Sequence, residues 1–397
     1  MSAFKTFKDF LKEDATFGKL KSLEHAEDLP ITSGAEGFHK SVEALHQAHE
    51  HVKTGHSEAK VTTKYDGSPS LVFGHHPESG KFFVATKSLF NKTPKINYTP
   101  ADIEANHGHA PGLVEHMKAA LTHLKKVAPK KGVYQGDLMY TNKSVQSDET
   151  HHHFTPNTIT YSTKKDSPEG KKISQAKLGM VVHTKYHGST LDNMNASFNP
   201  DVHNFKSHKD VHLISAEENK AHHTPENEAA YTKHIEAAKE LHKNAHPDMH
   251  HAVNLVKDHM LIHVNNTIRN GTKPSFEGLK KHLPEWYGKK IDAYKTEKSK
   301  APLRTELAGH MAHIEANKKH IETAFQIHHH LQQAKNALVS SLSQHPTFEH
   351  SINGHKTGPE GFVISHRGYP IKLVNREDFS RQNLLKQGSQ FAKKPTE

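Results

Sequence analysis

Short runs rich in β-branched and aromatic residues alternate with turn residues between about Val61 and Tyr186. Gly, Pro, Asn and Ser bound these runs, which is typical of strands in a twisted sheet. The strands predicted in this way are VTTKYDG, SLVFG, KFFVATK, GVYQGDLMY, TITYST and LGMVVHTKY. One segment between them, GLVEHMKAALTHLKKVA, has apolar residues at spacings of three, four and seven, which predicts an amphipathic helix. This part of the chain is therefore expected to be mixed α and β.

The composition shifts to Ala, Glu, Lys and His from about residue 224 to 344, and this shift favours helices. Thr224-Pro225 suits a helix cap followed by the first helical position. Asn-Gly at 270–271 and Lys-Pro at 273–274 predict breaks. Apolar residues at helical spacing form two stripes: Val253, Val256, Met260 and Val264, then Leu307, Met311, Ile314, Ile321 and Phe325. We expect a helical insertion here.

Strand-like sequence returns between about Gly354 and Phe379, in EGFVISH and YPIKLVN. A sheet domain that helices interrupt is more economical than three independent domains, because strands of this length cannot stand alone. The expected fold class is thus α+β. The expected organisation is an N-terminal helical segment at 1–60, a sheet domain at 61–215, a helical insertion at 216–348, the final strands at 349–385 and a tail at 386–397.

Composition limits the chemistry and the compartment. The 397 residues, 33% of them hydrophobic, are enough for a real core. No apolar run approaches the roughly 18 residues that span a bilayer, and MSAFKTFKDFLKED lacks the apolar stretch of a secretory signal, so we expect no membrane partner and a cytoplasm-like compartment. The absence of Cys excludes disulfides, thiolate metal sites and cysteine nucleophiles.

Charge suggests a class of partner. The formal net charge of +10 and the pI near 9.3 suit a polyanion, because Lys and Arg displace counterions from phosphates. General solubility is the simpler explanation. The basic residues are spread along the chain, yet nucleic acid is the partner that this charge favours.

The 40 histidines allow two interpretations. Clusters such as His151-His152-His153 suit metal ligands, but they show no repeated ligand spacing and no Cys accompanies them. We therefore expect most of them at solvated helix and loop positions. A shared response to mild acidification stays open, because the ordinary histidine pKa is about 6.5.

The segment Lys64-Tyr65-Asp66-Gly67 places a lysine at the end of a predicted strand, before an acid and a glycine. A lysine is a good nucleophile only when it is deprotonated, which requires desolvation or a neighbouring cation. Taken alone, Lys-x-Asp-Gly is more often an ordinary surface turn.

The order of the motifs changes that balance. KYDG is followed by YQGDLMY at 134–140, EGFVI at 360–364 and IKLVN at 371–375. This order resembles the covalent nucleotidyltransferase superfamily of ATP-dependent DNA and RNA ligases and messenger-RNA capping enzymes. The resemblance implies a ligase-type adenylation domain with antiparallel sheets, interrupted here by the large helical segment. It also implies that Lys64 attacks the α-phosphorus of a nucleotide and releases pyrophosphate.

The same resemblance implies roles for other residues. Asp137 and Glu360 match acids that hold Mg²⁺ (or Mn²⁺), and hard oxygen ligands suit that ion. Lys372 matches a lysine that neutralises the α-phosphate. Lys87 lies where many ligases place a basic residue. The residues expected to contact the nucleotide are Thr63, Tyr65, Asp66, Gly67, Lys87, Tyr134, Asp137, Glu360 and Lys372.

Departures from the family pattern affect the expected substrate. Asp137 is shorter than the usual Glu, and Val374 replaces a second lysine of the last motif. The few residues after that motif leave no room for the additional C-terminal domain of cellular DNA ligases and capping enzymes. We therefore expect an ATP-dependent RNA ligase that joins 5′-phosphate to 3′-hydroxyl ends through lysyl-AMP. DNA as the substrate and a GTP-using, capping-like transferase are the alternatives, and the oligomeric state stays open.

The overall layout also resembles an uncharacterised family of tailed-bacteriophage proteins. AFKTFKDFLKED is similar to targeting peptides of proteins packaged into phage heads, and Leu11-Lys12-Glu13 is similar to prohead protease sites. A plain amphipathic helix is the simpler interpretation. The resemblance implies the host cytoplasm or the virion as the location. It also leaves a competing hypothesis, a packaged nucleic-acid-binding protein with a ligase-like fold and little or no turnover.

Overall fold

The structure, a computed structural model, describes residues 23–198, 202–218 and 220–376. The targeting-like segment with Leu11-Lys12-Glu13 lies outside the described residues. The chain divides into two units, which are described separately. The first unit, the sheet unit, contains residues 58–218 and 345–370, and the second, the helical unit, contains residues 24–57, 220–344 and 371–376.

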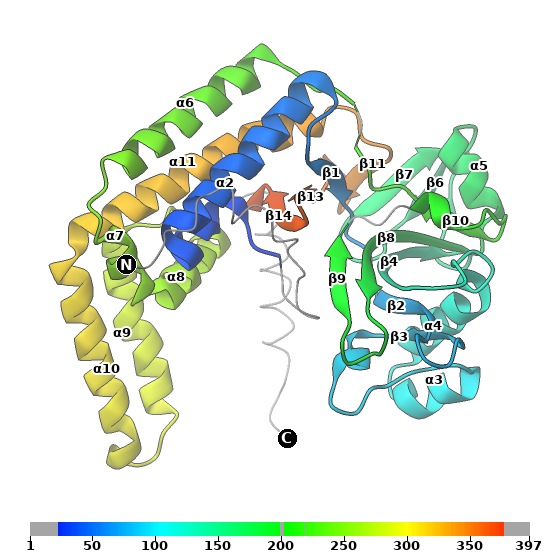
Figure 1. Cartoon of the computed structure of the whole chain (residues 1–397), viewed down its shortest axis with the longest axis horizontal. Helices are drawn as coiled ribbons and strands as arrows, with labels where there is room; N and C mark the ends of the chain where they lie inside the picture. The colour runs from blue at the N-terminus through cyan, green and yellow to red at the C-terminus, as the bar shows by residue number, and fades with distance from the viewer. Residues whose placement is uncertain (1–22, 199–201, 219, 377–397) are drawn as a thin grey trace. The chain divides into compact units, whose positions relative to one another are not determined.

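The largest sheet of the first unit holds most of the predicted strands. Its strands run in the order β10-β8-β4-β2-β3, with β9 on β8, and every pair is antiparallel except β10–β8. Helices α3 (Pro100–His107) and α4 (Pro111–Leu124) lie beside this sheet (Figure 1). The strand bounds are β2 (Ser70–His75), β3 (Phe82–Ala85), β4 (Val133–Thr141), β8 (Leu178–His187), β9 (Asn195–Phe198) and β10 (Val211–Ile214).

Both faces of this sheet are buried. The apolar side of α4 packs on one face, with Leu71, Phe73, Tyr134 and Leu138 from the strands. A second cluster, which includes Val72, covers the other face beside the short helix η2 (Lys87–Phe90). Because side chains alternate along β2 and β4, each residue of these strands faces either the core beside α4 or the core beside η2.

A second sheet joins segments that are far apart in the sequence. Its strand order is β12-β11-β7-β6-β5, and every pair in it is antiparallel. Helix α5 (Pro168–Gln175) follows β7. The strands are β5 (Gln146–Ser147), β6 (His151–Phe154), β7 (Thr160–Lys164), β11 (Glu349–Ile352) and β12 (His355–Thr357).

A three-stranded sheet has the order β1 (Lys60–Lys64), β13 (Gly361–His366) and β14 (Tyr369–Val374). Strand β1 pairs antiparallel with β13, and Lys64 lies opposite Gly361. The β1–β13 and β7–β11 pairings bring strands that follow the helices into the sheets of the region that precedes them. The chain thus leaves the sheet unit and returns to it.

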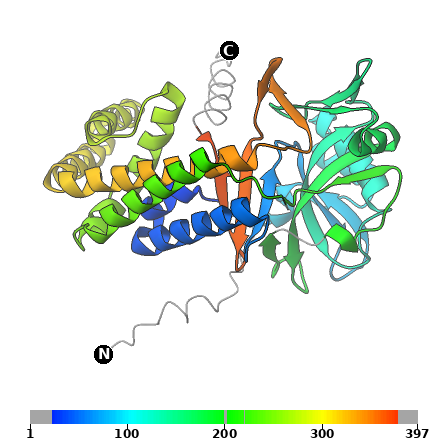
Figure 2. The same cartoon turned by 90° about the horizontal axis from the view of Figure 1, so that it is seen from above.

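The second unit is helical (Figure 2). Helix α6 begins at the predicted position, where the side chain of Thr224 accepts a hydrogen bond from the backbone of Asn227. Gly271 ends α8 in the left-handed conformation, as the Asn-Gly break predicted. The helices are α2 (Leu29–Thr54), α6 (Pro225–Lys243), α7 (Met249–Asn254), α8 (Lys257–Asn270), α9 (Phe276–Asp292), α10 (Glu297–Ala316) and α11 (Lys318–Leu342).

Helix α2 comes from the segment expected to stand by itself at the N-terminus. It packs instead against α11, so the described part of residues 1–60 that precedes Ser57 belongs with the helices at 220–344. None of the described helices is long and apolar enough to cross a membrane.

Buried charges connect three segments of the helical unit. Lys335 on α11 donates a hydrogen bond to Glu27 at 2.5 Å, and Arg376 donates to both carboxylate oxygens of Asp28 at 2.9 and 3.1 Å. Burial acts to raise the pKa of Glu27, but the adjacent cations lower it to about 2. This network holds the start of α2 and the end of β14 to α11 as paired charges, which is how buried charges are tolerated.

Several histidines are buried, so the solvated interpretation is wrong for them. The buried ones are His51, His107, His152, His212, His222, His259, His263, His328 and His350. A neutral imidazole is a flat, partly apolar ring that packs against other rings, as the ring of His263 does against Phe325 at 5.9 Å. Burial favours this neutral form and lowers the pKa of His263 to about 4.

Candidate active site

Lys64 is the last residue of β1, and the pairing of β1 with β13 decides its surroundings. Gly361 lies opposite Lys64, so the preceding residue, Glu360, is also adjacent. The Nζ atom of Lys64 contacts Oε2 of Glu360 in an ion pair. The side chain of Lys64 is 27% exposed and that of Glu360 is 11% exposed, so the pair is largely shielded yet reachable from solvent.

Asp137 lies on β4, directly opposite Ser70 of β2. The Nε2 atom of His183 is 3.4 Å from its Oδ1 atom. Burial acts to raise the pKa of Asp137, but His183, through its charge and a hydrogen bond, outweighs that effect. A hydrogen bond from Ser70 and the charge of Lys64 act in the same direction, so the pKa of Asp137 lies below its ordinary value. Asp137 and Lys64 therefore act on each other electrostatically.

Two glycines of the motifs are required by close packing. A Cβ atom on Gly67 would lie 2.6 Å from the Cβ atom of Asp137. A Cβ atom on Gly136 would lie 2.3 Å from the carbonyl oxygen of Val181. These separations are far below van der Waals contact, so only glycine lets the segment after Lys64 approach β4 and lets β4 approach β8.

Asp66 binds a neighbouring loop. Its Oδ1 atom accepts a hydrogen bond from Asn157 at 2.8 Å, and its Oδ2 atom accepts the N–H groups of Thr158 and Ile159 at 2.7 and 3.1 Å. Its own N–H group donates to the hydroxyl of Tyr161 at 2.7 Å. Asp66 thus connects the turn after Lys64 to the second sheet.

Two predicted nucleotide contacts lie in cores. Tyr65 packs against Tyr161 and Phe348, with ring centroids 5.8 and 6.2 Å away. Tyr134 packs in the α4-side core, 4.8 Å from the ring of Phe205. Tyr134 is three residues before Asp137, and residues an odd number apart on a strand face opposite sides; the structure places Tyr134 in the core away from Asp137.

The remaining predicted residues are at strand and helix ends. Thr63 is half-buried on β1 and donates its backbone N–H group to the carbonyl of Ala216 at 2.7 Å. Lys87 begins η2 and is exposed. Lys372 is on β14, among the residues of the helical unit, where its N–H group donates to the carbonyl of Glu24 at 2.9 Å. The structure therefore gathers Lys64, Glu360 and Asp137, and Gly67 packs against Asp137. The other predicted residues have separate surroundings.

Val374, which replaces the second lysine of the last motif, is 2% exposed. A lysine at this position would bring a charge into an apolar environment, which is unfavourable without a partner. The departure from the family pattern is thus consistent with the local packing.

Sequence reasoning missed three polar residues around Asp137, which are Ser70, Gln135 and His183. Gln135 donates a hydrogen bond to Ser70 at 2.9 Å and accepts one from the hydroxyl of Tyr186 at 2.5 Å. His183 lies beside an irregularity in the β4–β8 register. Alternation along β4 puts Gln135 and Asp137 on the same side, so that pair could have been inferred, but the register that brings in His183 could not.

The carboxylates of Asp137 and Glu360 suit Mg²⁺ or Mn²⁺, because these ions prefer oxygen ligands and keep several waters. Hydrogen bonds to Asp137 keep its pKa below the ordinary value, and Glu360 is positioned by its ion pair with Lys64. The donor set therefore fits the ion that the family resemblance implies.

A family model described as a family of unknown function (DUF6267) matches residues 21–387. The chain belongs to this family. No curated protein and no solved structure matches it. The DUF6267 match covers both units, so the sheet unit and the helical unit are both part of the family's common chain.

Proposed function

We propose that this DUF6267 protein is an ATP-dependent polynucleotide ligase that forms a covalent lysyl-AMP intermediate at Lys64. RNA is the preferred substrate class, with 5′-phosphate and 3′-hydroxyl ends. The ligase-type adenylation fold belongs to the same proposal. The observation that carries it is the contact of Lys64 with Glu360 across paired strands, with the charge of Lys64 also acting on Asp137.

The Lys64–Glu360 pair is partly exposed to solvent, unlike the fully buried structural pair of Lys335 and Glu27. Lys64 and Glu360 are 296 positions apart, yet they meet at the ends of two strands, and the charge of Lys64 acts on a second acid, Asp137. Clusters of titratable groups whose charges act on each other are typical of catalytic sites.

In the first step, the Nζ atom of Lys64 attacks the α-phosphorus of ATP. A nitrogen–phosphorus bond forms, the bond to the bridging oxygen breaks, and pyrophosphate leaves with the electron pair. Lys64 must also release a proton, which passes to the carboxylate of Glu360 that contacts its nitrogen. Mg²⁺ at Asp137 and Glu360 would supply positive charge against the phosphates.

AMP is then transferred to a 5′-phosphate end, and a 3′-hydroxyl attacks that end and releases AMP. Ser70 and His183 hold Asp137 in place during these steps, and Gln135 donates a hydrogen bond to Ser70. The net charge of +10 suits a phosphate-rich strand. Val374 replaces the second lysine of the last motif, so one expected phosphate contact is absent and we expect slow turnover.

The test is covalent labelling of the purified full chain with Mg²⁺ and α-³²P-labelled ATP or GTP, followed by denaturing electrophoresis. Lys64→Ala is compared with Lys60→Ala, which removes an exposed lysine from the same strand. We expect label from ATP on the wild type and on Lys60→Ala, and none on Lys64→Ala. Circular dichroism checks that both variants fold.

Each result has a clear consequence. Label that survives in Lys64→Ala would show that another residue is the nucleophile, and label from GTP alone would favour a capping-like transferase. No label from either nucleotide on a folded wild type would overturn the proposal and favour a nucleic-acid-binding, packaged protein without turnover. Positive labelling would be followed by a comparison of nicked and single-stranded RNA and DNA ends.

A further inference from the structure

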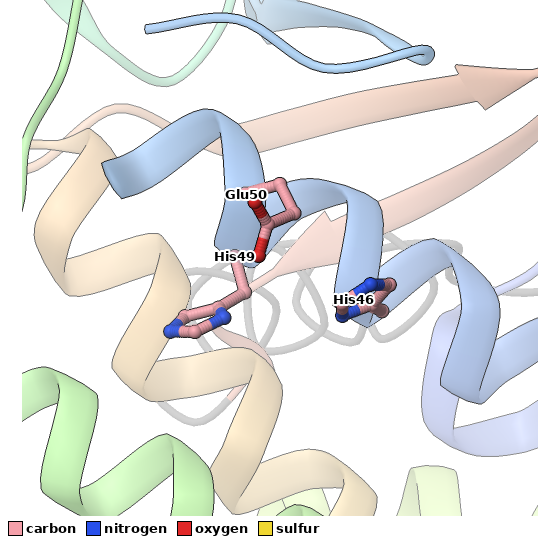
Figure 3. Close-up of side chains that lie close together, drawn as sticks. All are labelled: His46, His49 and Glu50. Atoms are coloured by element: carbon pink, nitrogen blue, oxygen red, sulfur yellow. The ribbon is translucent and has the colours of Figure 1, made fainter. Parts of the chain in front are cut away.

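Three side chains with metal-binding groups converge on one face of α2. His46 precedes His49 by three positions and Glu50 by four, and these spacings place His46 beside both on the helix surface. One ligand atom from each lies within 4.8 Å of the other two (Figure 3). Within residues 23–198, 202–218 and 220–376, it is the one group of three such side chains that could hold a metal ion.

Neighbouring helices fix the orientation of His49. Its ring stacks on Tyr231 of α6, with centroids 4.3 Å apart and planes 20° from parallel. Its Nε2 atom is 3.7 Å from Oε1 of Glu228, which is close but too long for a hydrogen bond. Metal-binding histidines commonly direct their second nitrogen at a carboxylate, which orients the ring. The other nitrogen of His49, Nδ1, is then available to an ion.

The carboxylate of Glu228, which lies near His49, has charged and polar partners of its own. Glu228 forms an ion pair with Lys53 at 3.3 Å and contacts His223. Two imidazoles and one carboxylate are thus presented from one helix, and a further carboxylate lies near one of the imidazoles.

We propose that His46, His49 and Glu50 bind one divalent transition-metal ion of the zinc type. Two nitrogens and one oxygen suit Zn²⁺ and its neighbours rather than Mg²⁺ or Ca²⁺, which prefer oxygen ligands. Three protein ligands leave a fourth position for water or a small ligand. The site belongs to the helical unit and is independent of the function proposed for Lys64.

The required adjustment is small. Zinc–nitrogen bonds of about 2.0–2.1 Å put neighbouring ligand atoms of a tetrahedron roughly 3.4 Å apart. The present separations, up to 4.8 Å, close by rotation of side chains. His46 is exposed and Glu50 is half-exposed, so both can rotate without disturbing the core.

The experiment is a titration of the metal-free full chain with Co²⁺, followed by visible absorption, and then displacement by Zn²⁺. We expect one tightest site per chain, with absorption bands typical of four- or five-coordinate Co²⁺ that Zn²⁺ removes. His46→Ala and Glu50→Gln should each weaken that site at least tenfold. His56→Ala and Glu36→Gln, which change exposed residues on or just after the same helix, should leave its affinity unchanged.

These four variants also distinguish the proposed site from Co²⁺ binding to other histidines, of which the chain has 40 in all. If His46→Ala and Glu50→Gln bind Co²⁺ as the wild type does, the tightest site lies elsewhere and the proposal fails. It also fails if the wild type shows no site tighter than about 10 μM. Circular dichroism separates lost binding from lost folding, and exposed His46 offers the variant least disruptive to the fold.

Discussion

At the scale of single residues, Asp66 and Lys64 have different tasks although they are two positions apart. Lys64 reaches an acid from the far end of the chain, whereas Asp66 is buried and accepts three hydrogen bonds from residues 157–159. A buried carboxylate with three donors is a structural anchor. Asp66 therefore positions Lys64 indirectly, by fixing the turn that follows it.

Removal of this anchor should destabilise the sheet unit. Asp66→Ala leaves the N–H groups of Thr158 and Ile159 without their acceptor, so the free energy of unfolding should fall by about 2 to 4 kcal/mol. Urea unfolding followed by circular dichroism measures this loss. The matched control is Asp166→Ala at an exposed position, with an expected change within about 0.5 kcal/mol. Equal stability of the two variants would contradict the anchoring role.

The same residues show what the sequence can and cannot indicate about the site. The order of the motifs predicted that Lys64, Asp137 and Glu360 share a site, and the ion pair and the mutual electrostatic effect are consistent with that prediction. Motif membership gave no direction for side chains. Tyr65 and Tyr134 belong to the same motifs, yet they pack in cores, because the position of a strand residue relative to the pleat decides its surroundings.

At the scale of elements, the contact between β4 and β8 limits which residue can precede Asp137. The register shifts beside Gly136, and the carbonyl oxygen of Val181 occupies the space where a side chain would begin. The sequence predicted both strands from their composition. It could not give the register, because pairing partners depend on contacts between segments that are distant in the chain.

Gly136→Ala should therefore force β4 and β8 apart. The added methyl group would lie 2.3 Å from the Val181 oxygen, and we expect a loss of about 2 kcal/mol or more in the stability of the sheet. Hydrogen exchange at the amides of β4 and β8 would report this as faster exchange. Gly112→Ala on α4 is the control, because no atom lies within 4 Å of its added carbon and alanine favours helices. Slow exchange retained in Gly136→Ala would contradict the packing argument.

At the scale of the whole chain, the two units are built from segments that alternate along the sequence, and each unit contains a different cluster of charged residues. The sheet unit holds the candidate active site, whereas the helical unit holds the buried ionic network of Glu27, Asp28, Lys335 and Arg376. Composition predicted the helices and the returning strands. It could not predict that helix α2 packs with α11, because many amphipathic helices can satisfy the same apolar stripe.

Buried histidines make the helical unit sensitive to acid. Burial is the main cause that lowers the pKa of His242, His259 and His263 to about 4, and neighbouring histidines lower it further. The unfolded chain binds protons at these positions below about pH 6.5, whereas the folded unit binds them only near pH 4. The free energy of unfolding should therefore be steady above about pH 6.5 and decrease as the pH falls from 6.5 to 4.

The one tryptophan of the chain, Trp286, lies on α9 of the helical unit with its ring 4.7 Å from that of His259, so its fluorescence reports on this unit. Urea unfolding followed by this signal should give a midpoint that decreases between pH 6.5 and 4.5. Glu27 remains ionised in this window because its pKa is about 2, so protonation of that carboxylate does not explain the decrease. His263→Gln retains an acceptor for the Ser275 N–H group and should make the decrease shallower, whereas His56→Ala at an exposed position should not. A midpoint that is the same at pH 7 and pH 4.5 would show that these histidines become protonated without cost, and the argument from burial would then be wrong.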